Sequence, residues 1–231
     1  VADDKRDVIH ALFTLLAEHA AAWDAIALHN IPDRSSTVDI LRDLAAPCGL
    51  RLLVRGNVAC PAIRYSEVRG GASALLRKDS LQRPFRHFGR DGQLTFRSIE
   101  HIEDAQRWLP VFFAQHIERW NNARHSSLFQ DSLNKRFYEE LVREMLPTGR
   151  LVFSMIEHEA KPIAFHIGFS YANTFLWYKP SFDFRLRRHS PGNLMLRFLL
   201  QDSIARHDRE FDFTVGDEPF KRRYANVIRH N

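Results

Sequence analysis

A basic loop followed by the start of a helix is the stretch of this sequence best suited to bind an anion. Residues 185–193 read RLRRHSPGN. The first turn of a helix has unpaired N–H groups and a partial positive charge, and Gly192 lets the backbone approach a ligand closely. The stretch predicts a pyrophosphate cradle made by Arg187, Arg188, His189, Ser190, Gly192 and Asn193. The alternative is a capped helix that follows a solvated basic loop.

A second informative stretch combines a strand, a tight turn and a short helix. Residues 211–224 read FDFTVGDEPFKRRY, and strand alternation turns Asp212 away from the phenylalanines beside it. A carboxylate within a strand needs partners, so Asp212 is expected in a salt bridge, a cap or a functional contact. Asp217 is expected to cap a helix that begins near Pro219. Lys221 then lies in the first turn, where the helix dipole does not favour a cation, which indicates an anionic or carbonyl partner or a solvated side chain.

The elements that would position these stretches form a series from residue 94 onward. Apolar spacing predicts strands over 94–99, 151–157, 162–170, 174–179 and 210–215, and helices over 102–120, from Asp131 or Ser132 to Pro147, over 193–207 and from Pro219. Pro110 is expected to kink or split its helix, and the turn at 158–161 predicts a hairpin. The order from residue 94 is therefore β-α-α-β-β-β-α-β-α.

The N-terminal part predicts further elements before a boundary at residues 55–70. Helices are expected over 2–20 and 37–46, strands over 23–28 and 50–54, and a partly helical stretch over 75–90 that Pro84 interrupts. That last stretch carries a basic face, which is either solvated or in contact with an anionic acceptor. The face consists of Arg83, Arg86, His87 and Arg90.

Composition excludes several classes of protein. The 231 residues are 45% hydrophobic and 26% charged, which is typical of a globular chain with a sizeable core. Two cysteines exclude a disulfide-rich scaffold, and the absence of a close His and Cys cluster predicts no metal site. No apolar run reaches the roughly 18 residues of a membrane span, and the charged N-terminus is unlike a secretory signal. We therefore expect a mixed α/β protein of the cytoplasm, with a net charge of +5 that permits an anionic ligand.

Five segments in order along the chain carry a resemblance. They are LLRKDSLQRPFRHFGRDGQLTF (75–96), HIERW (116–120), KPIAFHIGF (161–169), SPGNLML (190–196) and FDFTVGDEPFKRRY (211–224). Together they resemble the GCN5-related N-acetyltransferase (GNAT) fold, and more narrowly its CelD-type branch and the related Fem-type peptidyl transferases. The resemblance implies a GNAT-like α/β domain at 71–231, with a mixed central sheet flanked by helices. Residues 1–70 look like the truncated C-terminal part of a first, tandem GNAT-like domain.

The resemblance also implies a place for acetyl-CoA. Its pantetheine arm would lie between the splaying strands 174–179 and 210–215, and its pyrophosphate on the loop 187–193. The family loop reads Arg/Gln-x-x-Gly-x-Gly/Ala, whereas this loop has one extra residue and a single glycine. Phe220 stands where family members often have tyrosine.

Direct transfer of the acyl group requires a base for the attacking amine and an acid for the departing thiolate. The candidate bases are His166, Asp212 and Glu157, and the candidate acids are Tyr178 and Tyr224. Lys221 matches a lysine associated with handling the acyl donor. The segment with His116, Arg119 and Trp120 matches the helix that flanks the acceptor cleft. The alternatives are a buried structural histidine, a salt bridge for Asp212, and aromatic side chains of the core.

The leading interpretation is an acyl-CoA-dependent acyltransferase, an N-acetyltransferase in the simplest case. Its acceptor would be a small molecule or saccharide of the cell envelope, and no nucleic acid is expected. A Fem-like transferase that uses aminoacyl-tRNA is the alternative, although the chain has no heptad hairpin for a coiled-coil arm. A non-catalytic scaffold of polysaccharide synthesis is a third interpretation, favoured by the single glycine and by Phe220. Each is compatible with a homodimer and with attachment to the inner face of the membrane through partners.

Overall fold

The structure, a computed structural model, describes residues 2–29, 31–32, 35–54, 58–90 and 92–230. Its centre is a mixed sheet of seven strands in the order β2-β3-β4-β5-β6-β1-β7. The strands are β1 (Ala59–Arg64), β2 (Leu94–Ile99), β3 (Leu151–His158), β4 (Lys161–Tyr171), β5 (Thr174–Phe182), β6 (Glu210–Asp212) and β7 (Val227–His230). Strands β5 and β6 run parallel, and the other neighbouring pairs are antiparallel. The expected mixed α/β class is confirmed.

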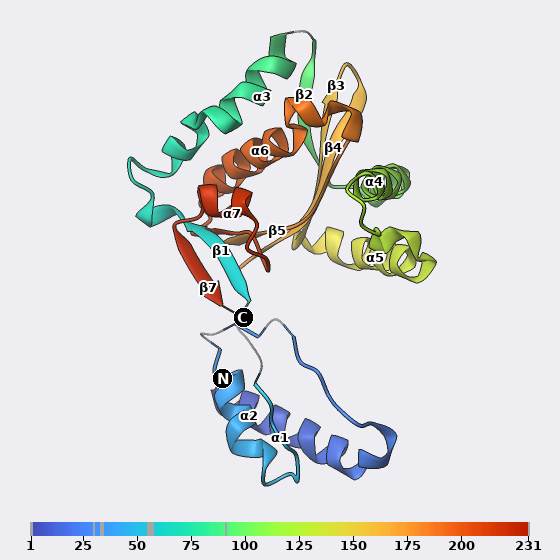
Figure 1. Cartoon of the computed structure of the whole chain (residues 1–231), viewed down its shortest axis with the longest axis vertical. Coiled ribbons are helices and arrows are strands. Elements are labelled where there is room, and N and C mark those ends of the chain that lie inside the picture. Colours follow the sequence, from blue (N-terminus) through green and yellow to red (C-terminus); the bar gives the residue numbers. More distant parts are fainter. Residues whose placement is uncertain (1, 30, 33–34, 55–57, 91, 231) are drawn as a thin grey trace.

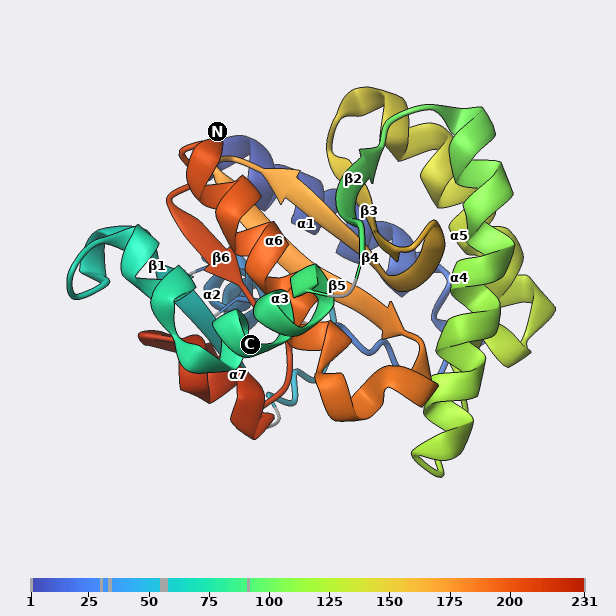
Figure 2. The same cartoon turned by 90° about the horizontal axis from the view of Figure 1, so that it is seen from above.

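Helices cover both faces of this sheet (Figure 1). One face packs against α4 (Ile102–Asn122) and α5 (Ser132–Met145), and the other against α3 (Asp79–Arg90) and α6 (Pro191–Ala205). Figure 2 shows the same two layers from above, with α4 and α5 on one side and α6 on the other. The short helix α7 (Pro219–Tyr224) lies beside β1. No helix in the described part of the chain is long and apolar enough to cross a membrane.

Each layer has its own apolar core. Under α4 and α5 the core includes Phe112, Phe129 and Phe153, and under α3 and α6 it includes Leu81, Leu199 and Phe211. Because β3 and β4 lie in the middle of the sheet, both faces of these strands are buried over most of their length, and their sequences read as nearly continuous apolar runs. In β5 buried residues alternate with partly exposed ones over Thr174–Tyr178.

Helices α1 (Ala2–Glu18) and α2 (Thr37–Ala45) form a separate small core around Phe13, Leu41 and Leu44. Figure 1 shows this pair apart from the sheet. Both helices confirm the sequence prediction. The strands predicted over 23–28 and 50–54 are wrong, because neither segment pairs with another strand among the described residues, and an unpaired strand leaves its backbone groups without partners.

The predicted division of the chain at residue 70 stays a prediction. The sheet bears on its position, because β1 pairs with both β6 and β7. A boundary that keeps the sheet whole therefore lies before Ala59. No strand was predicted at either β1 or β7. Strand β1 contains Pro61 and lacks polar alternation, and β7 has only four residues.

The predicted interruption at Pro84 and the predicted split at Pro110 are wrong, and the kink at Pro110 stays a prediction. Pro84 lies inside α3 and Pro110 inside α4, and both helices continue past them. The apolar neighbours Leu81 and Phe88 of α3, and Leu109 of α4, are buried in the two cores. Packing of this kind can outweigh the loss of one helical hydrogen bond.

Candidate functional site

The two parallel strands of the sheet separate after a short contact. Pairing between β5 and β6 ends at Leu176 and Asp212. Strand β5 continues to Phe182, whereas β6 stops and the chain turns away. The Thr214 hydroxyl donates to the Trp177 carbonyl at 3.1 Å just beyond the last pair. The parallel strands therefore splay, as the resemblance implies.

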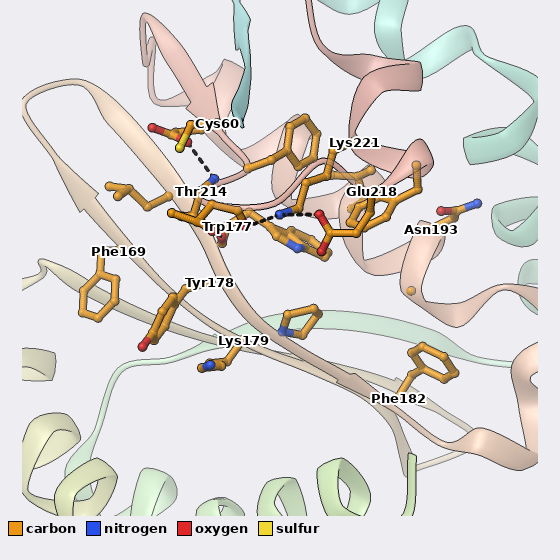
Figure 3. A pocket seen from close by; sticks show the side chains of 18 of the residues that line it. Cys60, Phe169, Trp177, Tyr178, Lys179, Phe182, Asn193, Thr214, Glu218 and Lys221 are labelled. Carbon is orange, nitrogen blue, oxygen red and sulfur yellow. Dashed lines mark hydrogen bonds and ion pairs between the residues drawn. The ribbon is translucent and has the colours of Figure 1, made fainter. Parts of the chain in front are cut away.

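A hollow of about 830 Å³ opens where the strands part. The predicted acceptor residues, His116, Arg119 and Trp120, lie in its wall together with Tyr178, Asp212 and Lys221. Gly192 and Asn193, at the start of α6, line it too. Figure 3 shows Tyr178 and Phe169 on one side of this hollow and Asn193 at the other end. The predicted residues that do not line it are His166, Tyr224, Glu157, Arg187, Arg188, His189 and Ser190.

Lys221 is a buried cation at the rim of the splay. Only 4% of its surface is exposed, and its Nζ donates to the Val215 carbonyl at 2.7 Å and pairs with Glu218 at 2.9 Å. Figure 3 shows the ion pair between Lys221 and Glu218. The expected anionic or carbonyl partner is therefore confirmed, and both kinds are present. A Cβ at Gly216 would lie 2.4 Å from Glu218 Oε2 and 2.9 Å from Lys221 Nζ, so only glycine leaves room for this pair.

Asp217 does not cap α7. Glu218 holds the cap position and makes no side-chain capping hydrogen bond. Asp217 instead forms an exposed ion pair with Arg222, which holds the pKa of this carboxyl below its ordinary value. The Asp217 carboxylate therefore pairs with Arg222 and does not bind the N–H groups at the start of α7.

Asp212 is bound by protein groups on both carboxylate oxygens. Oδ1 accepts from the Thr214 N–H at 2.7 Å, and Oδ2 accepts from Arg229 at 2.5 Å. Arg229 also pairs with the buried Glu210. The salt bridge is therefore the observed role of Asp212, and its predicted role as a base stays a prediction.

His166 lies in the core outside the hollow, which argues against its predicted role as a base. The side chain is fully buried, and Nε2 accepts from the Tyr178 backbone N–H at 3.2 Å. Burial lowers the pKa of His166 to about 3, so the ring is neutral near pH 7. Glu157 lies on β3 and pairs with Arg97 at 3.3 Å, outside the hollow as well.

The two candidate acids have different surroundings. Tyr178 is 39% exposed at the hollow, and its hydroxyl accepts from Tyr138 at 3.1 Å. Burial raises the pKa of Tyr138, so this tyrosine keeps its proton. Tyr224 is buried, and its hydroxyl is 2.8 Å from the Ser80 hydroxyl, so it packs in the core. Of these two candidates, Tyr178 alone lines the hollow.

The predicted acceptor residues form a cationic and aromatic wall. Arg119 donates to the Pro180 carbonyl at 2.6 Å and lies 4.5 Å from the Phe182 ring centroid. Burial lowers the pKa of Arg119, and no carboxylate pairs with it in the described part of the chain. His116 stacks on Trp120, and burial with nearby Arg119 lowers its pKa to about 3. The wall therefore has one guanidinium without a counter-ion and a neutral imidazole.

The start of α6 is open to a ligand. Ser190 is the cap residue, in a left-handed conformation, and its side chain makes no capping hydrogen bond. Its carbonyl accepts from the N–H groups of Asn193 and Leu194, while the Gly192 N–H has no acceptor among the described residues. The preceding loop is a short 3₁₀ helix, η6 (Phe184–His189), with exposed basic side chains. Such a helix start can bind an anion.

A sequence profile of the acetyltransferase (GNAT) domain matches residues 76–222. The chain belongs to this family. The matched range holds α3 to α6 and most of α7, with the splayed strands and the open helix start. The sheet and its flanking helices are those of a GNAT-like fold. The narrower CelD-type assignment stays a prediction, and a comparison with curated proteins found no match.

Solved structures that share this fold include the following three. FemX has a TM-score of 0.63 and 10% identity, and the alignment covers 97% of this chain and 75% of FemX. L-PGS from Bacillus licheniformis has a TM-score of 0.58 and 11% identity, over 85% and 64% of the two chains. The third structure is the C-terminal domain of a protein described as a putative lysylphosphatidylglycerol synthetase from Agrobacterium fabrum. Its TM-score is 0.56 and its identity is 16%, and the alignment covers 91% of this chain and 60% of that domain. At these identities the likeness shows the fold alone.

Proposed function

We propose that this GNAT domain is an acyltransferase that takes an acyl group, an acetyl group in the simplest case, from acyl-CoA. The acceptor would be an amine or a hydroxyl of a small molecule or saccharide. The observation that carries the proposal is the hollow between splayed parallel strands, which reaches the open start of α6. The ligand chemistry that fits this shape is an extended arm ending in a diphosphate.

The residues present fit CoA in two respects. The uncapped start of α6 offers the free N–H of Gly192, and the hollow continues from there along β5. The lining is mainly apolar and aromatic, with Trp177, Phe213 and Phe220 among its side chains, which suits a pantetheine arm. One Gly in the loop is enough for this cradle, because Gly192 already contributes the unpaired N–H.

The chain's own groups would then position the reactants. Bound acyl-CoA supplies the activated thioester. Lys221 holds the turn at Val215 and Glu218, which forms one edge of the hollow. The Tyr178 hydroxyl, which Tyr138 supports, is the phenol placed to give a proton to a leaving thiolate. Because His166 lies outside the hollow and Asp212 is engaged by Arg229, we assign removal of the acceptor proton to water.

The acceptor would occupy the side of the hollow formed by α4. Arg119 lines the hollow with no carboxylate partner in the described chain, and a guanidinium fork matches a carboxylate or phosphate. Trp120 is 37% exposed beside it and offers a ring face for a sugar or other flat group. An anionic saccharide fits this pair of residues.

The proposal has two further parts. The first 70 residues belong to a tandem GNAT-like domain, and the protein acts in the cytoplasm.

Thermal unfolding with and without millimolar acetyl-CoA tests the proposal, with free CoA and ATP as comparisons. A donor site predicts a rise in Tm with both CoA species and none with ATP, because a ligand that binds only the native state stabilises it. Acceptor candidates are then incubated with acetyl-CoA, and acetylated products are sought by mass spectrometry. A steeply salt-dependent affinity for RNA without a CoA effect would favour the Fem-like alternative. The absence of both effects would favour a scaffold.

A further inference from the structure

Two histidines from distant parts of the chain stack beside the start of α6. His87 of α3 and His189 of η6 have ring centroids 4.0 Å apart and an interplanar angle of 8°. Phe88 meets the edge of this stack, with its centroid 6.3 Å from that of His189. His189 is nevertheless exposed, so the surface of its ring that His87 and Phe88 do not cover is open. The stack therefore ends in an accessible aromatic surface.

Exposed arginines surround this stack. Arg83 and Arg90 lie one helical turn before and after His87 on α3, and Arg188 directly precedes His189. All three side chains are exposed. Arg86, on the same face of α3, is paired with Asp79 at 2.9 Å. Within the described part of the chain, no carboxylate pairs with Arg83, Arg90 or Arg188, and these cations are free to meet an anion.

The stack lies next to the proposed acyl-CoA site at the start of α6, called the donor site here. His189 is followed by Ser190, and the open N–H of Gly192 is three residues away. Helix α3 packs along α6, and His87 on the C-terminal half of α3 brings its arginines to the same end of α6. In CoA the adenosine is attached directly to the diphosphate and carries a further phosphate at its 3′ oxygen. A ligand whose diphosphate sits on α6 would therefore place its adenosine near this stack.

We infer that the His87–His189 stack and the neighbouring arginines form a subsite for the 3′-phosphoadenosine end of CoA. His189 stacks on the adenine, and Arg188, with Arg90 from α3, binds the 3′-phosphate. The inference rests on the proposed function, and it deepens it by naming the donor. Pantetheine carried on a protein lacks the adenosine, and the terminal adenosine of an aminoacyl-tRNA lacks the 3′-phosphate. The subsite thus selects free acyl-CoA.

Calorimetric titration with CoA, dephospho-CoA and 4′-phosphopantetheine tests the subsite. For the wild type we expect CoA to bind at least about tenfold more tightly than dephospho-CoA, because a charge-assisted contact is lost. Arg188→Met should reduce this ratio to less than about threefold, whereas Arg136→Met on the exposed face of α5 should leave it unchanged. His189→Ala should weaken CoA and dephospho-CoA about tenfold each and leave 4′-phosphopantetheine unaffected, since it removes only the stack. His10→Ala on α1 is the matched control.

The outcomes separate this inference from the proposed function. If CoA and dephospho-CoA bind equally well and His189→Ala changes neither, the subsite does not exist, although the donor site does. If CoA and 4′-phosphopantetheine both fail to bind to the wild type, the proposed function fails and the subsite with it. All four substitutions are at exposed positions, so we expect the far-ultraviolet circular dichroism of each variant to match that of the wild type.

Discussion

The imidazole of His166 accepts a hydrogen bond from the backbone N–H of Tyr178 at 3.2 Å. This hydrogen bond joins β4 and β5 beside the register shift at Gly168, although the residue paired opposite His166 is Pro180. A Cβ at Gly168 would lie 2.4 Å from the His166 ring and 2.5 Å from the Leu176 carbonyl. The histidine thus takes the place of a backbone acceptor at the irregular step. It holds the strand that carries Tyr178 into the hollow.

This role predicts a measurable pH dependence of stability. The pKa of His166 is about 3 in the native state and about 6.5 when the chain is unfolded, so below pH 6.5 only the unfolded state takes up the proton. The stabilising effect is complete above about pH 6.5 and is lost as the pH falls toward 3, by up to about 1.4 kcal/mol per pH unit. In His166→Gln this contribution should be absent, while His116 keeps its own.

Urea unfolding at intervals between about pH 7 and pH 4 measures the effect. The free energy of unfolding should fall less steeply with decreasing pH in His166→Gln than in the wild type. Parallel curves for the two proteins would show that His166 is protonated in the native state, and that the core position assigned to it is incorrect.

Gly216 is predicted to be needed for the Lys221–Glu218 pair. Gly216 has φ +121°, and an added Cβ would collide with both charged groups. Gly149 is a matched control, because it has φ +67° with no atom within 4 Å of an added Cβ. Alanine at either position should cost roughly 1–2 kcal/mol of backbone strain. Only Gly216→Ala should also weaken binding of CoA, as measured by calorimetry. If both variants bind CoA with equal affinity, the Lys221–Glu218 pair does not contribute to the CoA-binding site.

Arg229 is predicted to hold the β6 end of the site together. Its side chain is 11% exposed and pairs with Glu210 and Asp212, which are 8% and 18% exposed. Arg229→Met removes the cation that Glu210 and Asp212 share, and Arg64 lies 4.0 Å from Glu210 at the limit of an ion pair, so the free energy of unfolding should fall by about 3–5 kcal/mol. The exposed pair Arg222–Asp217 is the control. Arg222→Met should change the free energy of unfolding by less than about 1 kcal/mol. Urea unfolding of both variants measures these changes. If Arg229→Met lowers the free energy of unfolding as little as Arg222→Met does, the buried ion-pair network does not stabilise the fold as proposed.

Much of the fold could be predicted from apolar spacing. The helix over 102–120 and the hairpin of β3 and β4 were predicted within a few residues, because their patterns are long and regular. Spacing could not reveal β1 and β7, since both are short and their partners lie far away in the sequence. It also made isolated extended segments such as 23–28 look like strands, since pairing is a property of the whole sheet.

The candidate site could be predicted in part. The carbonyl and anionic partners of Lys221 follow from its unfavourable place in a helix start, and the structure contains both. For His166 the sequence left a base and a buried structural histidine open, because alternation does not show that helices cover both faces of β4; the structure shows the buried position. The pairing of Asp212 with Arg229 had no signal in the sequence, since it spans β1 and depends on the order of the strands.

The central claim is that the open start of α6 binds the diphosphate of CoA, and calorimetric titration of CoA into Gly192→Glu tests it most directly. A Cβ at residue 192 would meet the Phe182 ring at 3.5 Å, an ordinary contact, so the fold should tolerate the change. Leu133→Glu, at a 72% exposed position of α5, adds the same charge away from the hollow. We predict saturable binding to the wild type and to Leu133→Glu, and binding at least about tenfold weaker to Gly192→Glu. Equal binding to all three proteins, or no binding to the wild type, would contradict the claim.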